Sequence, residues 1–217
     1  MTLRLVLAVS LDGRLAAPAG GAAQLAGAAD RRALEECLAW ADACLMGAGS
    51  LRAHGSSCLI HAPDLLSQRA ERGAPAQPPL LLVSRQCPPP RLDPDWPFWR
   101  QPLQRWLVAP ASQDQLPPAG FERLLPLQPW PQLLAELAHS QGLERLLLLG
   151  GAQLAGELLQ ADLVDELQLS LCPLLLGGTY PWLPLVVVPK PQRWQLLEQR
   201  PLDRGELLLR YQRTGNC

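Results

Sequence analysis

Two glycines that follow a run of leucines are the residues best suited to bind a phosphate. Gly150 and Gly151 end the apolar run 146–149, which is typical of a strand buried on both faces. Leucines at helical spacing follow over 154–159, and residues 166–171 alternate polar and apolar as the next strand does. A glycine turn lets a ligand approach the backbone, and amides at a helix N-terminus attract phosphate. A tight end to a strand is the alternative interpretation.

A second junction of this kind follows the expected strand 43–46, where small residues occupy 47–50. Two such junctions in one α/β chain favour a dinucleotide ligand, although neither carries the full glycine fingerprint of a classical Rossmann domain. A third strand, 80–83, ends in Ser84 and Arg85. A hydroxyl beside a guanidinium suits a 2′-phosphate, because arginine offers a charged, planar set of donors. An exposed polar strand end is the alternative.

Two ionisable side chains are candidates for catalysis. Asp12 lies in an Asp-Gly turn after the first expected strand, 3–9, where open α/β folds place their ligands. His54 follows the second junction, and an imidazole titrates near neutral pH. Hydride transfer to a carbonyl or imine requires a proton or a hydrogen-bond donor at the acceptor. We predict that His54 supplies the proton and that Asp12 positions polar groups of the substrate; a plain turn and a solvated histidine are the alternatives.

Composition excludes several other classes of function. The chain has 217 residues, is 48% hydrophobic and carries 19 basic against 20 acidic residues, so we expect one domain over 1–217 and no nucleic-acid or anionic-membrane partner. Its six cysteines and three histidines lack the spacing of metal sites, so we expect no metal. No apolar run reaches the roughly 20 residues of a membrane span. We therefore expect a cytoplasmic protein with reduced cysteines.

The elements that must position these residues alternate between strands and helices and end in a hairpin. Asp30 is predicted to cap a helix, residues 87–102 are too rich in proline for regular helix, and 16–29 and 63–79 are expected to be loops. The pattern predicts an α/β fold with a mostly parallel sheet. Further expected elements are a helix with its apolar face over 33–41, a strand at 106–109, a helix over 130–138, and hairpin strands at 194–199 and 206–212.

Five short motifs occur in an order that resembles a known family. They are Ser10-Leu11-Asp12-Gly13-Arg14, Gly47-Ala48-Gly49-Ser50-Leu51-Arg52-Ala53, Gly150-Gly151-Ala152-Gln153-Leu154, Leu163-Val164-Asp165-Glu166-Leu167 and Pro173-Leu174-Leu175-Leu176-Gly177. Together they resemble the reductase domain at the C-terminus of the bifunctional riboflavin-biosynthesis deaminase/reductase. The resemblance covers nearly the whole chain. It implies a dihydrofolate-reductase-like, three-layer α/β/α fold, with a mostly parallel central sheet and a C-terminal antiparallel hairpin.

The resemblance also implies a reaction. NADPH would deliver a hydride to the opened ribosyl carbon of a small-molecule substrate, 5-amino-6-(5-phosphoribosylamino)uracil, in an enzyme that is a homodimer. Ala8 would contact the cofactor through its backbone, Ser50 and Ser84 would bind it through hydroxyls, and the turn from Gly150 to Gly156 would bind the pyrophosphate. With the physical arguments above, the predicted cofactor set is Ala8, Gly47, Ser50, Ser84, Arg85, Gly150, Gly151, Ala152, Gln153 and Leu154.

The substrate side departs from the family pattern, because neutral or histidine side chains stand where the family has charged or polar side chains or a tryptophan. A polar substrate that is buried needs paired partners. Two alternatives therefore stay open: a reductase of a less charged substrate, and a dimeric nucleotide-binding module without catalysis. The departures fall at Ala22, Gln24, Leu38, His54, His61 and Leu149.

Overall fold

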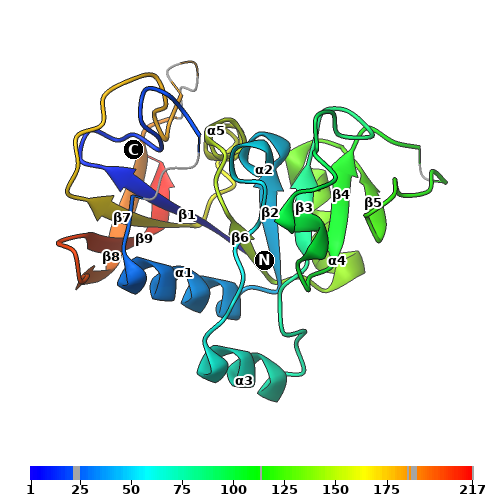
Figure 1. Cartoon of the computed structure of the whole chain (residues 1–217), viewed down its shortest axis with the longest axis horizontal. Coiled ribbons are helices and arrows are strands. Elements are labelled where there is room, and N and C mark those ends of the chain that lie inside the picture. Colours follow the sequence, from blue (N-terminus) through cyan, green and yellow to red (C-terminus); the bar gives the residue numbers. More distant parts are fainter. Residues whose placement is uncertain (22–24, 113, 185, 187–189, 217) are drawn as a thin grey trace. The chain divides into compact units, whose positions relative to one another are not determined.

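A computed structural model describes residues 1–21, 25–112, 114–184, 186 and 190–216 of the chain. The chain divides into two compact units, one made of residues 1 and 35–147 and the other of residues 2–34 and 148–217. Figure 1 shows the elements of both units, coloured along the chain. Among the described residues, no helix has the length and apolar character needed to cross a membrane.

The first unit contains a parallel sheet with buried strands. Its strand order is β5-β4-β3-β2-β6, and the pairs β2/β3, β3/β4 and β4/β5 are parallel. Continuous apolar runs form β2 to β4, as strands covered on both faces require. The bounds are β2 (Ala43–Gly47), β3 (Leu80–Val83), β4 (Arg105–Ala109), β5 (Arg123–Pro126) and β6 (Arg145–Leu148).

The helices of the first unit begin where local sequence allows them to. Proline stands in the first turn of three of them, where its missing N–H costs nothing. The buried side chains of α4 lie on one face, with Leu137 four residues after Leu133 and three after Leu134. The bounds are α2 (Ala48–His54), α3 (Pro63–Glu71), the 3₁₀ helix η1 (Pro97–Arg100) and α4 (Trp130–Gln141).

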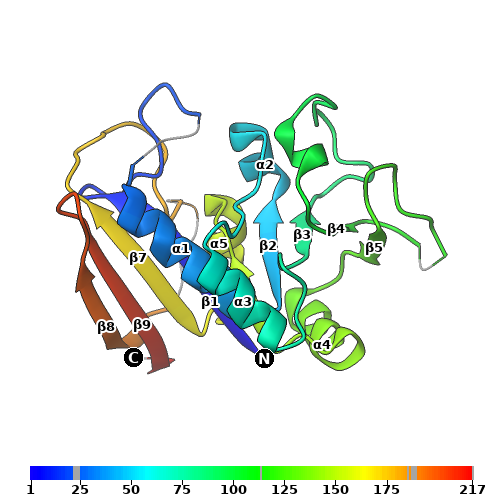
Figure 2. The same cartoon turned by 60° about the horizontal axis from the view of Figure 1, so that its bottom comes forward.

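The second unit combines parallel strands with the expected hairpin. Its strand order is β1-β7-β9-β8; β1 and β7 are parallel, whereas β7/β9 and β8/β9 are antiparallel. Figure 2 shows the first turns of α1 in front of β1 and β7. The bounds are β1 (Thr2–Ser10), α1 (Ala28–Trp40, its first seven residues in this unit), α5 (Ala152–Gln160), β7 (Glu166–Cys172), β8 (Gln192–Pro201) and β9 (Leu207–Asn216).

The prediction that 63–79 is a loop was wrong, because α3 occupies its first half. Pro63 is the first helical residue, a position that tolerates proline, and no further proline interrupts the helix before Glu71. Leu65 and Arg69, four residues apart, form its buried face. A buried arginine on that face is a signal that hydrophobic patterning alone does not detect.

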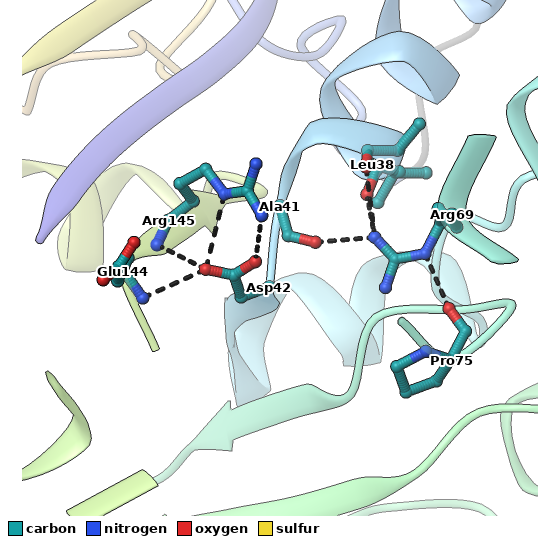
Figure 3. Close-up of polar contacts among 8 residues, drawn as sticks. Leu38, Ala41, Asp42, Arg69, Pro75, Glu144 and Arg145 are labelled. Atoms are coloured by element: carbon teal, nitrogen blue, oxygen red, sulfur yellow. Dashed lines mark hydrogen bonds and ion pairs between the residues drawn. The ribbon is translucent and has the colours of Figure 1, made fainter. Parts of the chain in front are cut away.

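Arg69 is fully buried and bonds to backbone carbonyl groups (Figure 3). Its Nη1 donates to the carbonyl of Ala41 at 2.6 Å and to those of Leu38 and Ala39, and its Nε donates to Pro75 at 2.7 Å. These acceptors lie at the C-terminal end of α1 and in the loop after α3. One guanidinium therefore satisfies the carbonyls at the end of a helix and holds a loop against it.

A second charged contact joins the start of β2 to β6 (Figure 3). The carboxylate of Asp42 accepts 2.6 and 3.4 Å bonds from the Arg145 guanidinium and bonds from the amides of Glu144 and Arg145. Burial alone would raise the pKa of Asp42, but these donors hold it below its ordinary value.

Asp30 does not cap α1 as predicted, because the helix begins two residues earlier, at Ala28. The carbonyl of Gly27 accepts the first helical bond, from the amide of Arg31. The amide of Gly27 donates to the buried carboxylate of Glu206, at 2.8 Å. A side chain distant in sequence thus satisfies the amide just before α1, and Asp30 lies in the first turn.

The proline-rich segment 87–102 contains no α-helix, as predicted, and is held in place near its C-terminal end. Phe98 is fully buried, and Trp99 packs edge-on against it, with 4.9 Å between the ring centroids. The guanidinium of Arg105 donates to the carbonyls of Phe98, Trp99 and Gln101. The aromatic residues therefore anchor the loop.

Candidate active site

The predicted site residues fall in both units, so they form two separate sets. The first unit contributes the ends of β2 and β3 and helix α2. The second contributes the ends of β1 and β6, the glycine turn and helix α5. The first set is Gly47, Ser50, His54, Ser84 and Arg85, and the second is Ala8, Asp12, Gly150, Gly151, Ala152, Gln153 and Leu154.

The glycine turn has the conformation that its residues predict. Gly150 and Gly151 have φ values of 83° and 94°, which side chains with a Cβ rarely adopt. A Cβ on Gly150 would lie 3.0 Å from Cδ2 of Leu7, so the turn packs directly against β1. Gly151 precedes the first residue of α5, and no side chain caps that helix.

The start of α5 offers donors that fit a phosphate. Because the helix begins at Ala152, the amides of its first turn have no partner within the helix. The side chain of Leu154 is buried, so this residue would contact a ligand through its backbone. Gln153 is exposed on the same turn. The turn and its amides fit the pyrophosphate of a dinucleotide.

The end of β1 lies beside the end of β7 in a parallel register. Ala8 pairs with Ser170 and Ser10 with Cys172. Ser170 and Cys172 are both buried. This brings the predicted cofactor contact, Ala8, next to a buried hydroxyl that sequence patterning did not single out.

Asp12 organises the loops after these strands. Its Oδ1 accepts bonds from the Ser10 hydroxyl at 2.6 Å and from the Leu176 amide, and its Oδ2 accepts one from the Gly177 amide at 2.8 Å. The Ser10 hydroxyl and the Leu176 amide hold the pKa of Asp12 well below its usual range. Both carboxylate oxygens therefore serve to join two loops, and the carboxylate is a poor proton source.

The second junction forms a short helix rather than a glycine turn of the same kind. Gly47 has φ −73° and ψ 143°, an ordinary extended conformation, and precedes α2. Ser50 is half-buried in its first turn. His54 ends the helix and is exposed, and loss of solvent around its imidazole lowers its pKa. At neutral pH its ring is therefore mainly unprotonated.

The proline-rich segment 87–102 packs against Gly55, the residue that follows His54. Gly55 adopts φ 64°, and a Cβ there would meet the ring of Trp96 at 3.3 Å. The amide of Phe98 donates to the carbonyl of Gly55. Loop 87–102 thus fixes the C-terminal end of α2, where the candidate proton donor stands.

Ser84 and Arg85 differ in how they are placed. The Ser84 hydroxyl is buried, donates to the carbonyl of Gln86 at 2.8 Å and accepts from its amide at 3.2 Å. It therefore shapes the turn after β3. Arg85 is exposed. Of the two, only Arg85 has an exposed side chain.

The positions that depart from the family pattern are placed as follows. Leu38 is a core residue with 1% exposure, so it cannot contact a substrate. His61 is exposed, and its amide donates to the buried Glu35, which also accepts from Ala62 at the start of α3. Leu149 is half-buried beside the glycine turn. Ala22 and Gln24 lie outside the described residues.

A carboxyl group that patterning missed lies at the start of α1. Asp30 forms a side-chain hydrogen bond with Ser170, and burial together with the nearby Glu206 raises the pKa of its carboxyl. The sequence predicted a capping role for this residue, because aspartate is frequent just before helices. Only the packing of α1 on β7 reveals a partly desolvated acid.

No group of three or more histidine, cysteine, aspartate or glutamate side chains suited to a metal ion occurs in the part of the chain that the structure describes.

Comparisons with known proteins place this arrangement among reductases. The family model described as "RibD C-terminal domain" matches residues 1–208. The 2,5-diamino-6-ribosylamino-4(3H)-pyrimidinone 5′-phosphate reductase of Methanothermobacter thermautotrophicus is 27% identical over 187 residues, covering 79% of this chain and 77% of that protein. The reductase of the same name from Archaeoglobus fulgidus is 25% identical, covering 79% of this chain and 80% of that one.

A solved structure of Acinetobacter baumannii RibD superimposes with a TM-score of 0.79 at 25% identity. It covers 98% of this chain, and this chain spans 58% of its length. The expected dihydrofolate-reductase-like α/β fold, with mostly parallel strands and an antiparallel C-terminal hairpin, is confirmed.

Proposed function

The chain belongs to the RibD C-terminal domain family, and from this premise we propose that it is an NADPH-dependent reductase of a ribosylaminopyrimidine 5′-phosphate. Its similarity to two reductases of such a compound supports the reaction class. The observation that carries the proposal is the glycine turn, which packs against β1 and stands directly before the N-terminus of α5.

In the proposed reaction, bound NADPH supplies a hydride to the ribosyl carbon of the ring-opened sugar. The residues of the chain do the rest. The turn at Gly150 and Gly151 admits the pyrophosphate, and the amides of α5 neutralise part of its charge. The backbone of Ala8 positions the nicotinamide. His54 is proposed to supply the proton that the acceptor atom takes up.

The preference for NADPH over NADH is proposed to depend on Arg85. Its guanidinium is exposed directly after β3, whereas the hydroxyl of Ser84 is engaged by the backbone of Gln86. A guanidinium binds phosphate through paired, charge-assisted hydrogen bonds. We also propose that the chain forms a homodimer, which sedimentation velocity would test.

The experiment is a turnover assay with purified protein. Oxidation of NADPH is followed with the 2-amino pyrimidinone and the uracil forms of the 5-amino-6-ribosylamino 5′-phosphate compound. Substrate-dependent oxidation of NADPH with either form supports the proposal. If NADPH binds and neither form is reduced, the reductase assignment is wrong, and the alternative of a non-catalytic nucleotide-binding module gains support.

A second candidate is a reductase of a less charged substrate on the same scaffold. The half-buried Leu149, at a position where the family pattern has a glutamate, favours it. Uncharged pyrimidines and small ketones in the same assay distinguish the two candidates.

A further inference from the structure

The second unit contains a pocket of about 280 Å³ that is lined by none of the residues proposed to bind NADPH or substrate. Residues from the last turn of α5, from β7 and from the start of β8 line it. Its two most buried lining residues are Leu159 and Leu167, and two half-buried indoles, those of Trp182 and Trp194, line it as well. A concave surface with a mostly apolar and aromatic lining is typical of sites for small molecules.

Hydrogen bonds hold two sides of this pocket in place. Nε2 of Gln192 donates to the carbonyl of Leu159 at 3.1 Å and to the carboxylate of Asp162 at 2.7 Å, which joins the start of β8 to the end of α5. The amide of Trp182 donates to the carbonyl of Gly13 at 3.1 Å, and a Cβ on Gly13 would lie 3.5 Å from the indole ring. The pocket is therefore preformed, so a ligand does not have to order these residues when it binds.

The indole of Trp194 comes from an irregular position in β8. Arg193 pairs with Gly215 of β9, whereas Trp194 pairs with Arg213, so the register shifts between these two neighbours. Such bulges change the direction in which a strand presents its side chains. Aromatic rings prefer to contact one another by offset stacking or edge to face. Two indoles in one pocket therefore favour a planar aromatic ligand over an aliphatic one.

The pocket also contains a cation, Lys190, which is the only lysine in the chain. Lys190 is exposed, and within the described residues its ammonium has no hydrogen bond or ion pair. Asp162, an acid beside the pocket, bonds to Gln192 instead. An ammonium attracts a carboxylate as a point charge, and the attraction is stronger where apolar walls exclude water. The pocket thus combines aromatic walls with one unpaired positive charge.

We propose that this pocket binds a planar aromatic carboxylate, with its ring against Trp182 and Trp194 and its carboxylate paired with Lys190. The site is separate from the proposed cofactor site, because Leu159 lies near the C-terminal end of α5 and the glycine turn stands before its N-terminus. The inference therefore does not depend on the proposed function.

The test compares 2-naphthoate with 2-naphthamide, a neutral compound that has the same ring and nearly the same shape. Calorimetry with the whole protein, with and without saturating NADPH, gives their affinities. We expect one molecule of 2-naphthoate per chain with a Kd below about 1 mM, and binding of the amide that is at least about tenfold weaker, because it lacks the charge. Lys190→Gln should lower the affinity for 2-naphthoate to that of the amide and leave the affinity for the amide unchanged.

Two further variants and a spectrum locate the ligand. Arg193→Gln removes an exposed cation of β8 that does not line the pocket, and should leave both affinities unchanged. Trp194→Leu keeps an apolar wall without the aromatic ring, and should weaken the binding of both compounds by about threefold or more. Because the chain has a single lysine, reductive methylation with ¹³C-formaldehyde gives one lysine signal and keeps the positive charge. Addition of 2-naphthoate should shift that signal.

The inference is overturned if 2-naphthoate does not bind, if the two compounds bind equally, or if Lys190→Gln keeps the wild-type preference. Loss of 2-naphthoate binding on saturation with NADPH would place the compound in the cofactor site and overturn it as well. A dimer that binds no 2-naphthoate would mean that a second copy of the chain covers the pocket. A protein that binds 2-naphthoate at Lys190 but never oxidises NADPH with a substrate keeps this inference and loses the reductase assignment.

Discussion

At the scale of single residues, the candidate site separates side chains that build loops from side chains open to a ligand. Both carboxylate oxygens of Asp12 accept hydrogen bonds, from the Ser10 hydroxyl and from the amides of Leu176 and Gly177. Hydrogen bonds thus join the loop that contains Asp12 to the loop that contains Leu176, although the two motifs are distant in sequence. Replacing Asp12 would disturb the loops as well as any contact with substrate.

Arg85 is expected to determine the choice between the two nicotinamide cofactors. Arg85→Gln removes the charged donors proposed for the 2′-phosphate, so NADPH affinity should fall about tenfold while NADH affinity stays within about twofold. Calorimetry with both cofactors measures this. Arg91→Gln, which removes an exposed charge later in the same loop, is the control. Equal loss for NADPH and NADH would contradict a 2′-phosphate contact.

His54 is expected to affect turnover rather than cofactor binding. Loss of solvent lowers the pKa of its imidazole, so the protonated fraction grows as pH falls below the ordinary value near 6.5. If His54 supplies the proton, kcat should rise on that acidic side, and His54→Ala should abolish the limb and leave NADPH affinity intact. A rate within about threefold of wild type, under about 1 kcal/mol of transition-state stabilisation, would show that His54 is not the donor.

At the scale of elements, the glycine turn joins local conformation to binding. Gly151 has φ 94°, so any side chain there strains the backbone. Gly142, at the end of α4, also has positive φ but has open space around it. Gly151→Ala and Gly142→Ala should both lower the melting temperature, and only Gly151→Ala should weaken NADPH binding, by about tenfold or more. Similar affinities for the two variants would argue against a phosphate at the turn.

Helix α3 carries a buried arginine, Arg69, in its last turn. Arg69→Leu leaves the carbonyls of Leu38, Ala39, Ala41 and Pro75 without their donor, so we expect a loss of about 2–4 kcal/mol in the free energy of unfolding. Denaturant titration measures it. Arg72→Leu, at the exposed end of the same helix, should change stability by less than about 0.5 kcal/mol. Equal effects would mean that the carbonyl contacts contribute little.

An element could be predicted from the sequence where its buried face consists of regularly spaced apolar residues. The strands of leucine runs and the leucine face of α5 follow from apolar spacing, and both were found where expected. Helix α3 was missed because its buried face includes Arg69, and β5 was missed because its four residues are mostly half-exposed. The cap of α1 was missed because the acceptor, Glu206, lies far away in sequence.

The candidate site was predictable only in part, for the same reason. A glycine pair between a strand and a helix can be recognised from the local sequence, because positive φ and close packing require glycine there. The contact between Asp30 and Ser170 has no local signature, since it depends on how α1 packs on β7. That Leu38 is core rather than site also emerged only from burial.

At the scale of the whole molecule, each compact unit carries part of the proposed machinery, and the single domain expected over 1–217 stays a prediction. One unit holds the glycine turn and Ala8, and the other holds His54 and Arg85. Family membership rests on a match over residues 1–208, which includes both units. The central claim for the whole chain is that NADPH bound to it transfers a hydride to a pyrimidine substrate.

Isotope transfer tests that requirement most directly. The protein is incubated with the 2-amino ribosylaminopyrimidine 5′-phosphate and NADPH carrying deuterium at C4 of the nicotinamide, in separate experiments for each stereoisomer. We expect a ribityl product that is one mass unit heavier with one of the two stereoisomers, with the label on the former ribosyl carbon and one NADP⁺ formed per product. A product that forms without label from either stereoisomer, or NADPH consumption without a ribityl product, would contradict it.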